Sequence, residues 1–206
     1  MARRRTRSPG RTGELWTVGH GTADGDALGR LLTGAGVGAV VDVRRFPGSR
    51  RNPAVNREAL AATLPRHGVA YRWDERLGGR RAAPPDSPDV ALRHPAFAGY
   101  AAHMRTPEFA AGVAELLAAE APTAVLCSES VWWRCHRRLI ADHVTLVHGV
   151  AVHHVLPGGR VQDHRLTEGV RLEPDGQLVY DAGQGPLPGP EPREESSGSS
   201  GSSPAR

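Results

Sequence analysis

Five short apolar segments, separated by stretches with helical periodicity, constrain the fold of this chain more than any other feature of its sequence. They are residues 15–18, 39–43, 69–73, 123–127 and 150–156. Strands that alternate with helices are typical of an open, mostly parallel sheet with helices on both faces. We therefore predict an α/β fold of about five strands, with helices over 24–32, 56–67, 97–104, 106–120 and 132–147.

Turn and cap residues agree with this pattern. Thr22 or Asp24 is a suitable N-cap for the first helix, and Thr106 precedes Pro107 at the start of the fourth. Residues 173–176, with the sequence Glu-Pro-Asp-Gly, are typical of a tight turn. The segment 160–181 is therefore predicted to form a C-terminal hairpin.

The two ends of the chain differ in composition from its middle. Residues 1–13 contain five arginines and no acid, and residues from about 183 onward are rich in Pro, Gly and Ser. We predict one α/β domain at 14–182, between a basic disordered tail at 1–13 and a second disordered tail at 183–206. The basic tail could contact nucleic acid weakly, although a loose, solvated tail is the preferred interpretation.

Charge and hydropathy exclude several classes of protein. All 26 basic residues are arginine, which together with abundant Ala, Gly and Pro indicates a GC-rich genome rather than selection for a basic surface. No apolar run approaches the roughly 20 residues of a membrane span, and none follows the N-terminal arginines as in an export signal. Two cysteines do not make a disulfide framework. We expect a cytoplasmic protein without membrane contact, whose oligomeric state the sequence leaves open.

Reactive side chains follow several of the predicted strands at the point where each strand ends. His20 follows the first strand, Arg44 and Arg45 follow the second, and Cys127 ends the fourth. Ligands of open parallel sheets bind beyond the carboxyl ends of the strands. We therefore predict that these side chains meet at one edge of the sheet.

The densest group of such residues lies between Cys127 and Arg137. A cysteine at a strand end, near a helix N-terminus and arginines, can be stabilised as a thiolate. His136 could act as its base, and Glu129 as an orienting partner or separate proton carrier. Arg137, and with it Arg134, could bind a phosphate or carboxylate bidentately. The alternative is that Cys127 and Cys135 are buried apolar residues and Arg137 an ion-pair partner.

Known motifs of cysteine and metal chemistry are mostly not matched. A cysteine-phosphatase loop needs an arginine six positions after its cysteine, where this chain has Trp133. The zinc-deaminase signature is missing from the sequence, and Cys127 and Cys135 stand eight positions apart without a second pair. A metal bound by Cys127, Cys135, His136 and a distant histidine such as His20 stays an alternative, as does a reversible disulfide.

Other histidines and glycines carry weaker signals. Gly19-His20-Gly21-Thr22, between a strand and a helix, could bind an anion through backbone N–H groups, but a tight turn is the preferred explanation. His153 and His154 lie within a predicted strand, where ordinary packing is the preferred interpretation.

A set of short motifs, in order along residues 15–157, resembles one protein family. The motifs are Val18-Gly19-His20-Gly21-Thr22, Asp42-Val43-Arg44, Leu77-Gly78-Gly79, Phe97-Ala98-Gly99-Tyr100, Thr106-Pro107-Glu108-Phe109, Cys127-Ser128-Glu129 and Cys135-His136-Arg137. The chain is similar to the bacterial and archaeal family called domain of unknown function 488. The resemblance implies an α/β fold and a single site containing His20, Arg44, Cys127, Glu129, Cys135, His136 and Arg137. The family brings no settled activity.

Three hypotheses for the function follow. The first is an enzyme, a hydrolase or transferase acting on a nucleotide or other small anionic substrate, in which Cys127 or Glu129 reacts. The catalytic candidates are Cys127, Glu129, Cys135 and His136; the substrate-binding candidates are His20, Arg44, Arg45, Tyr100 and Arg137. The second is a non-catalytic nucleotide- or nucleic-acid-binding module, and the third a Cys/His metal site. No cofactor fingerprint occurs, so we expect no cofactor.

Overall fold

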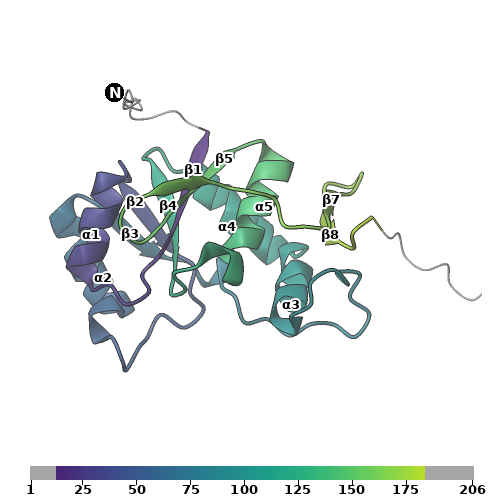
Figure 1. Cartoon of the computed structure of the whole chain (residues 1–206), viewed down its shortest axis with the longest axis horizontal. Helices are drawn as coiled ribbons and strands as arrows, with labels where there is room; N and C mark the ends of the chain where they lie inside the picture. Colours follow the sequence, from purple (N-terminus) through teal and green to yellow (C-terminus); the bar gives the residue numbers. More distant parts are fainter. Residues whose placement is uncertain (1–12, 184–206) are drawn as a thin grey trace, which may run out of the picture.

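The structure, a computed structural model, describes residues 13–183, and both predicted tails lie essentially outside the described residues. Its main sheet has six strands in the order β3-β2-β4-β1-β5-β6 (Figure 1). The strands are β1 (Glu14–Gly19), β2 (Ala39–Asp42), β3 (Ala70–Trp73), β4 (Thr123–Cys127), β5 (Ala151–Val155) and β6 (Val161–Asp163). The first five pair in parallel and β6 is antiparallel to β5. The predicted α/β fold is confirmed.

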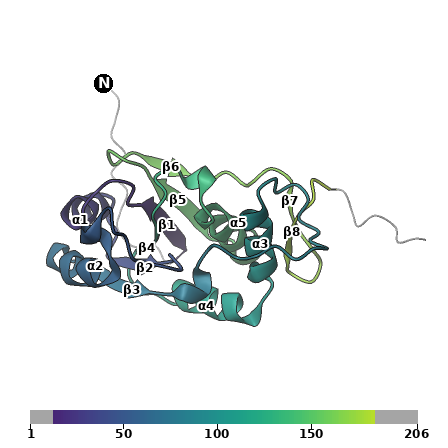
Figure 2. The same ribbon diagram turned by 90° about the horizontal axis from the view of Figure 1, so that it is seen from below.

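The helices form two layers, one on each face of the sheet. Figures 1 and 2 show α1 (Gly25–Gly34) and α2 (Arg57–Thr63) on one side, and α3 (Pro95–Met104), α4 (Pro107–Leu117) and α5 (Arg137–His148) on the other. Strand β4 contributes side chains to the cores on both faces of the sheet, because successive side chains point to opposite faces. Ala124 and Leu126 belong to the core beneath α1 and α2, whereas Val125 and Cys127 belong to the core beneath α3, α4 and α5.

Two predicted helix starts are confirmed at the level of single hydrogen bonds. Asp24 caps α1 by accepting a hydrogen bond from the Ala27 N–H at 2.7 Å. Thr106 caps α4 by accepting from the Phe109 N–H at 3.2 Å, with Pro107 at the first helical position. Both caps satisfy backbone donors that a helix start otherwise leaves without partners.

The C-terminal segment differs in part from the prediction. The hairpin is confined to β7 (Val170–Leu172) and β8 (Leu178–Tyr180), whose turn contains Gly176 at positive φ. Residues 161–163 instead form β6 at the edge of the main sheet. The reason is the turn before them: Gly158 and Gly159 both have positive φ, which lets the chain reverse tightly after β5.

The helix predicted for 132–147 is also shorter than expected. Residues 132–134 form one 3-10 turn, Cys135 has extended backbone angles (φ −121°, ψ 146°), and α5 starts at Arg137. Similar single turns occur at 53–55, 64–67 and 75–77. The extended residue places Cys135 and His136 ahead of α5 rather than inside it. Within the described residues, no helix has both the length and the apolar character needed to cross a membrane.

Candidate functional site

The carboxyl ends of β1, β4 and β2 lie side by side, because β4 is inserted between the other two strands. His20 therefore lies beside the end of β4, where its backbone N–H donates to the Cys127 carbonyl at 3.0 Å. Arg44 follows β2 on the other side. These ends open into a cavity of about 710 Å³. Its walls are formed by His20, Arg44, Arg45, Phe46, Gly48, Ser49, Gly79, Arg80, His94, Ala96, Phe97, Cys127, Ser128, Glu129, Trp133, Arg134, Cys135 and His136.

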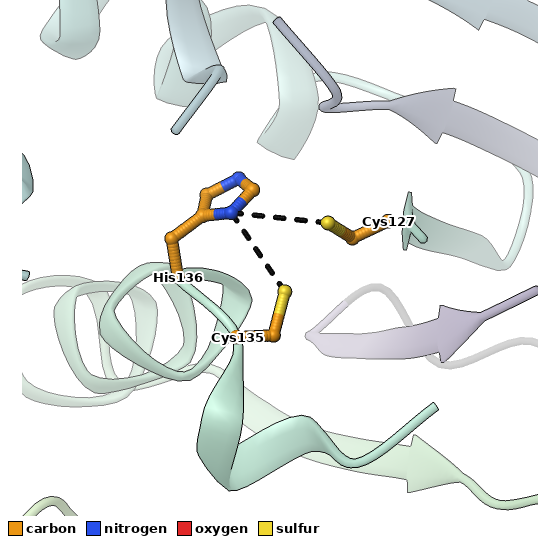
Figure 3. A group of neighbouring side chains, drawn as sticks. All are labelled: Cys127, Cys135 and His136. Carbon is orange, nitrogen blue, oxygen red and sulfur yellow. Dashed lines mark hydrogen bonds between the residues drawn. The ribbon is translucent and has the colours of Figure 1, made fainter. Parts of the chain in front are cut away.

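Two thiols and one imidazole nitrogen meet in this cavity. Cys127 Sγ lies 3.8 Å and Cys135 Sγ lies 3.7 Å from Nδ1 of His136, and both sulfurs point toward this nitrogen (Figure 3). All three atoms lie within 4.8 Å of one another. Cys127 is 6% and Cys135 4% exposed, so both thiols are shielded from bulk water yet reachable from the cavity. Neither cysteine forms a disulfide.

The orientation of His136 is set by groups on two other segments. Its Nε2 lies 3.1 Å from the Val43 carbonyl, which can only accept, so Nε2 carries the proton that is donated there. In the neutral ring, Nδ1 is then left with a lone pair directed at the two thiols. The Tyr100 ring packs edge-on against the imidazole at 4.9 Å, which holds its plane.

The two thiols differ in acidity. A hydrogen bond from the Cys135 thiol, together with His136 and the positive charge of Arg137, lowers the pKa of Cys127 well below its ordinary value despite burial. Burial and the neighbouring Cys127 sulfur raise the pKa of Cys135 well above its ordinary value. Cys127 is therefore the more acidic thiol of the pair, and Cys135 is its hydrogen-bond donor.

Arg137 supports the site from behind rather than lining the cavity. Its guanidinium is almost completely buried and donates to the backbone carbonyls of Glu129 and Ser130. These bonds hold the loop after β4 against the end of β1. A Cβ at Gly19 would lie only 1.8 Å from the Glu129 carbonyl oxygen, so this close approach requires glycine. The predicted anion ligand is thus a loop-positioning residue.

Arg44 and His20 face the cavity but already have partners. The Arg44 guanidinium forms a buried ion pair with Asp42 and donates to the Val55 carbonyl at 2.9 Å. Its third nitrogen lies 3.3 Å from His20 Nε2, and His20 Nδ1 lies 3.0 Å from the Gly21 carbonyl. Burial and then the Arg44 charge lower the pKa of His20. His20 is therefore neutral, with its proton on Nδ1.

The remaining predicted residues occupy different depths. Tyr100 is completely buried and donates to the Leu77 carbonyl at 2.8 Å, so it positions His136 and does not line the cavity. Glu129 is exposed on the wall, where its carboxylate accepts from the Val131 N–H at 3.1 Å. Arg45 lines the cavity and donates to the Arg80 carbonyl at 3.0 Å.

Sequence reasoning missed several residues of the cavity wall. Arg80 comes directly after Leu77-Gly78-Gly79, a motif that was identified without its neighbour. Arg134, by contrast, was predicted beside Arg137 as an anion ligand, and it does line the cavity. Phe46 and Trp133 are 64% and 50% exposed. The sequence feature that could have identified both residues is an aromatic side chain next to an arginine, near the end of a strand or the start of a helix.

The comparison with known proteins agrees with the motifs. A protein family described as "Domain of unknown function DUF488" matches residues 26–144, more than half of the chain. The chain belongs to this family. A search of curated proteins and a search of solved structures gave no significant match. The matched residues include the ends of β2 and β4 and the whole Cys127, Cys135 and His136 group, but not His20.

Proposed function

We propose that this DUF488 protein is an enzyme, a hydrolase or transferase, that acts on a nucleotide or another small anionic substrate in the 710 Å³ cavity. The observation that carries the proposal is the contact of the Cys127 and Cys135 thiols with the free nitrogen of His136. A thiolate beside an imidazole is an activated nucleophile with a proton carrier at hand. Its place on the cavity wall gives a substrate access to it.

The proposed reaction has two steps: formation of a covalent intermediate on Cys127, and its release. The Cys127 thiol first transfers its proton to His136 Nδ1. The thiolate then attacks the substrate, so that a bond forms between Sγ and the transferred group while the bond to the leaving group breaks and the leaving group takes the proton from Nδ1. Water or another acceptor next attacks the covalent intermediate; its proton goes to Nδ1 and the Sγ bond breaks. The proton on Nδ1 finally returns to Cys127.

The anion is bound by the arginines of the wall that have no carboxylate partner. Arg45, Arg80 and Arg134 line the cavity, and among the described residues none of them forms an ion pair. Arg44 is different, because Asp42 already compensates its charge. Guanidinium groups without a carboxylate partner are suited to bidentate binding of phosphate or carboxylate oxygens.

A metal centre is a second candidate, and one observation favours it. The sulfur–nitrogen distances are 3.8 and 3.7 Å. A sulfur and a nitrogen bound to tetrahedral zinc would be about 3.5 Å apart, given Zn–S of about 2.3 Å and Zn–N of about 2.0 Å. The Nε2–H bond from His136 to the Val43 carbonyl is the outer contact that metal-binding histidines use. Cys127, Cys135 and His136 would then supply three ligands, with the fourth position facing the cavity.

Thiol alkylation resolved by mass spectrometry tests the nucleophile. Iodoacetamide should modify Cys127 faster than Cys135 at pH 7, and the Cys135 rate should increase with pH while the Cys127 rate changes little. His136→Gln should slow modification of Cys127, whereas His94→Gln, on the same wall, should not. Equal rates at both thiols would contradict the assignment of Cys127.

Turnover and metal content separate the remaining alternatives. Nucleoside mono-, di- and triphosphates should be consumed by the native protein and bound without turnover by Cys127→Ser. Nucleotide binding unaffected by Cys127→Ser, with no turnover by the native protein, would instead support a binding module. One zinc ion per chain in the purified native protein, lost in Cys135→Ser, would support the metal centre and refute the free nucleophile.

A further inference from the structure

The cavity continues into a second hollow. This hollow has a volume of about 700 Å³ and is bounded by residues before α3, by the 3-10 turn at 132–134 and by the segment 165–169. His94, Phe97 and Trp133 line both hollows. The two hollows are therefore adjoining parts of one groove, with Phe97 and Trp133 at the junction.

Positive charge is concentrated along this groove although the described chain is neutral. Residues 13–183 contain 19 arginines and 19 acidic residues. Six arginines line the groove without an ion pair among the described residues, against two acids, Glu129 and Glu168. These arginines are Arg45, Arg80 and Arg134 in the first hollow and Arg93, Arg138 and Arg165 in the second. The charge indicates an anionic ligand that spans both hollows.

Aromatic faces accompany the arginines. Trp133, at the junction, is 50% exposed, and Phe46, on the wall of the first hollow, is 64% exposed. The Arg138 guanidinium lies over the Phe97 ring at 4.4 Å from its centroid. Exposed aromatic rings between arginines are the platform on which proteins stack the bases of single strands, while the arginines contact the phosphates.

We infer that the groove binds single-stranded nucleic acid. One nucleotide enters the first hollow toward Cys127, and its neighbours pass over Trp133 into the second. The inference rests on the proposed function for the role of the first hollow and narrows its substrate class from a free nucleotide to an oligonucleotide. A duplex is not suited to this site, because its stacked bases cannot reach a thiol that is 6% exposed.

Fluorescence anisotropy with a labelled eight-residue oligothymidylate tests the inference. The full chain carrying Cys127→Ser is used, so that binding is measured without turnover. The octamer should bind at least about tenfold more tightly than thymidine monophosphate, and its affinity should decrease with salt with a logarithmic slope of about −0.7 per phosphate contacted. Trp133→Ala should weaken octamer binding by about tenfold, because one stacked base is lost.

Charge-reversal substitutions test where the oligonucleotide lies on the protein. Arg165→Glu in the second hollow should weaken octamer binding and leave binding of the monophosphate unchanged. Arg160→Glu is the matched control: Arg160 is exposed and nearby in sequence but lines neither hollow. The basic N-terminal residues are present in every variant, so their contribution cancels.

The possible failures are distinguishable. Equal affinity for octamer and monophosphate, equal weakening by both charge reversals, or equally tight binding of a poly-glutamate peptide would overturn the inference while leaving the Cys127 chemistry intact. Tight octamer binding that depends on Arg165, in a protein whose thiols react equally, would instead support the groove and refute the proposed nucleophile.

Discussion

Acidification from pH 7.5 to pH 5 should destabilise this protein through one buried histidine, His154 on β5. It is completely buried, and Trp132 stacks on its ring at 4.0 Å. Its Nδ1 lies 2.7 Å from the Thr17 hydroxyl, and its Nε2 lies 3.0 Å from His164 Nδ1. His164 Nε2 in turn donates to the buried carboxylate of Asp142 at 2.9 Å. Each link of this chain of hydrogen bonds has one donor and one acceptor when the His154 ring is neutral.

The magnitude follows from the pKa of His154. Burial, and then positive charge on neighbouring groups such as Arg137, lower this pKa from 6.5 to about 3. The unfolded chain therefore binds a proton first. The stability contributed by the neutral ring is complete above pH 6.5 and is lost progressively as the pH falls toward 3. At pH 5 the loss is about 2 kcal/mol, taking an unfolded pKa of about 6.5.

Urea unfolding followed by tryptophan fluorescence measures this loss. His154→Gln keeps two hydrogen-bonding groups but cannot titrate, so it should start less stable at pH 7.5 and lose about 2 kcal/mol less than the native protein on transfer to pH 5. His94→Gln, at an exposed position, serves as the control and should follow the native protein. A native protein and a His154→Gln variant that lose the same free energy of unfolding would refute the assignment of a neutral, buried His154.

Substitutions of two glycines test the close packing around the site. Gly79→Ala would place a Cβ 2.8 Å from His136 Nδ1 and displace the ring; alkylation of Cys127 should slow, whereas Gly34→Ala, with no atom within 4 Å, should leave the rate unchanged. Gly19→Ala would place a Cβ 1.8 Å from the Glu129 carbonyl oxygen. It should lower the free energy of unfolding by about 2 kcal/mol or more in urea titrations, as overpacking does; a loss below about 0.5 kcal/mol would contradict the close approach.

The sheet and the location of the site were predictable because both depend on local patterns. Strand β4 matches its predicted residues, 123–127, since an apolar run bounded by Pro122 and a polar loop leaves little choice. Once strands and helices alternate, the carboxyl ends of the parallel strands must face one way. That rule alone brought His20, Arg44 and Cys127 to a common edge.

The roles of individual long side chains were not predictable in the same way. Arg137 was expected to bind an anion, but its guanidinium turns back to the carbonyls of Glu129 and Ser130. Direction along a flexible side chain depends on which acceptors tertiary packing brings near it, and strand and helix periodicity carries no such information. Tyr100 was expected to contact substrate for its place in a motif, yet it packs behind His136.

The arginines divide according to burial, and this division explains why the overall basic charge says little about the ligand. A buried guanidinium loses its hydration and must be matched by a carboxylate or carbonyls. Arg44 is matched by Asp42 in this way, and Arg137 by the loop carbonyls. Charge available to a ligand must therefore come from exposed arginines. In this fold those at the site, Arg80 and Arg134, lie on the loops after β3 and β4. For the proposed anionic substrate, specificity should accordingly reside in these loops rather than at the strand ends.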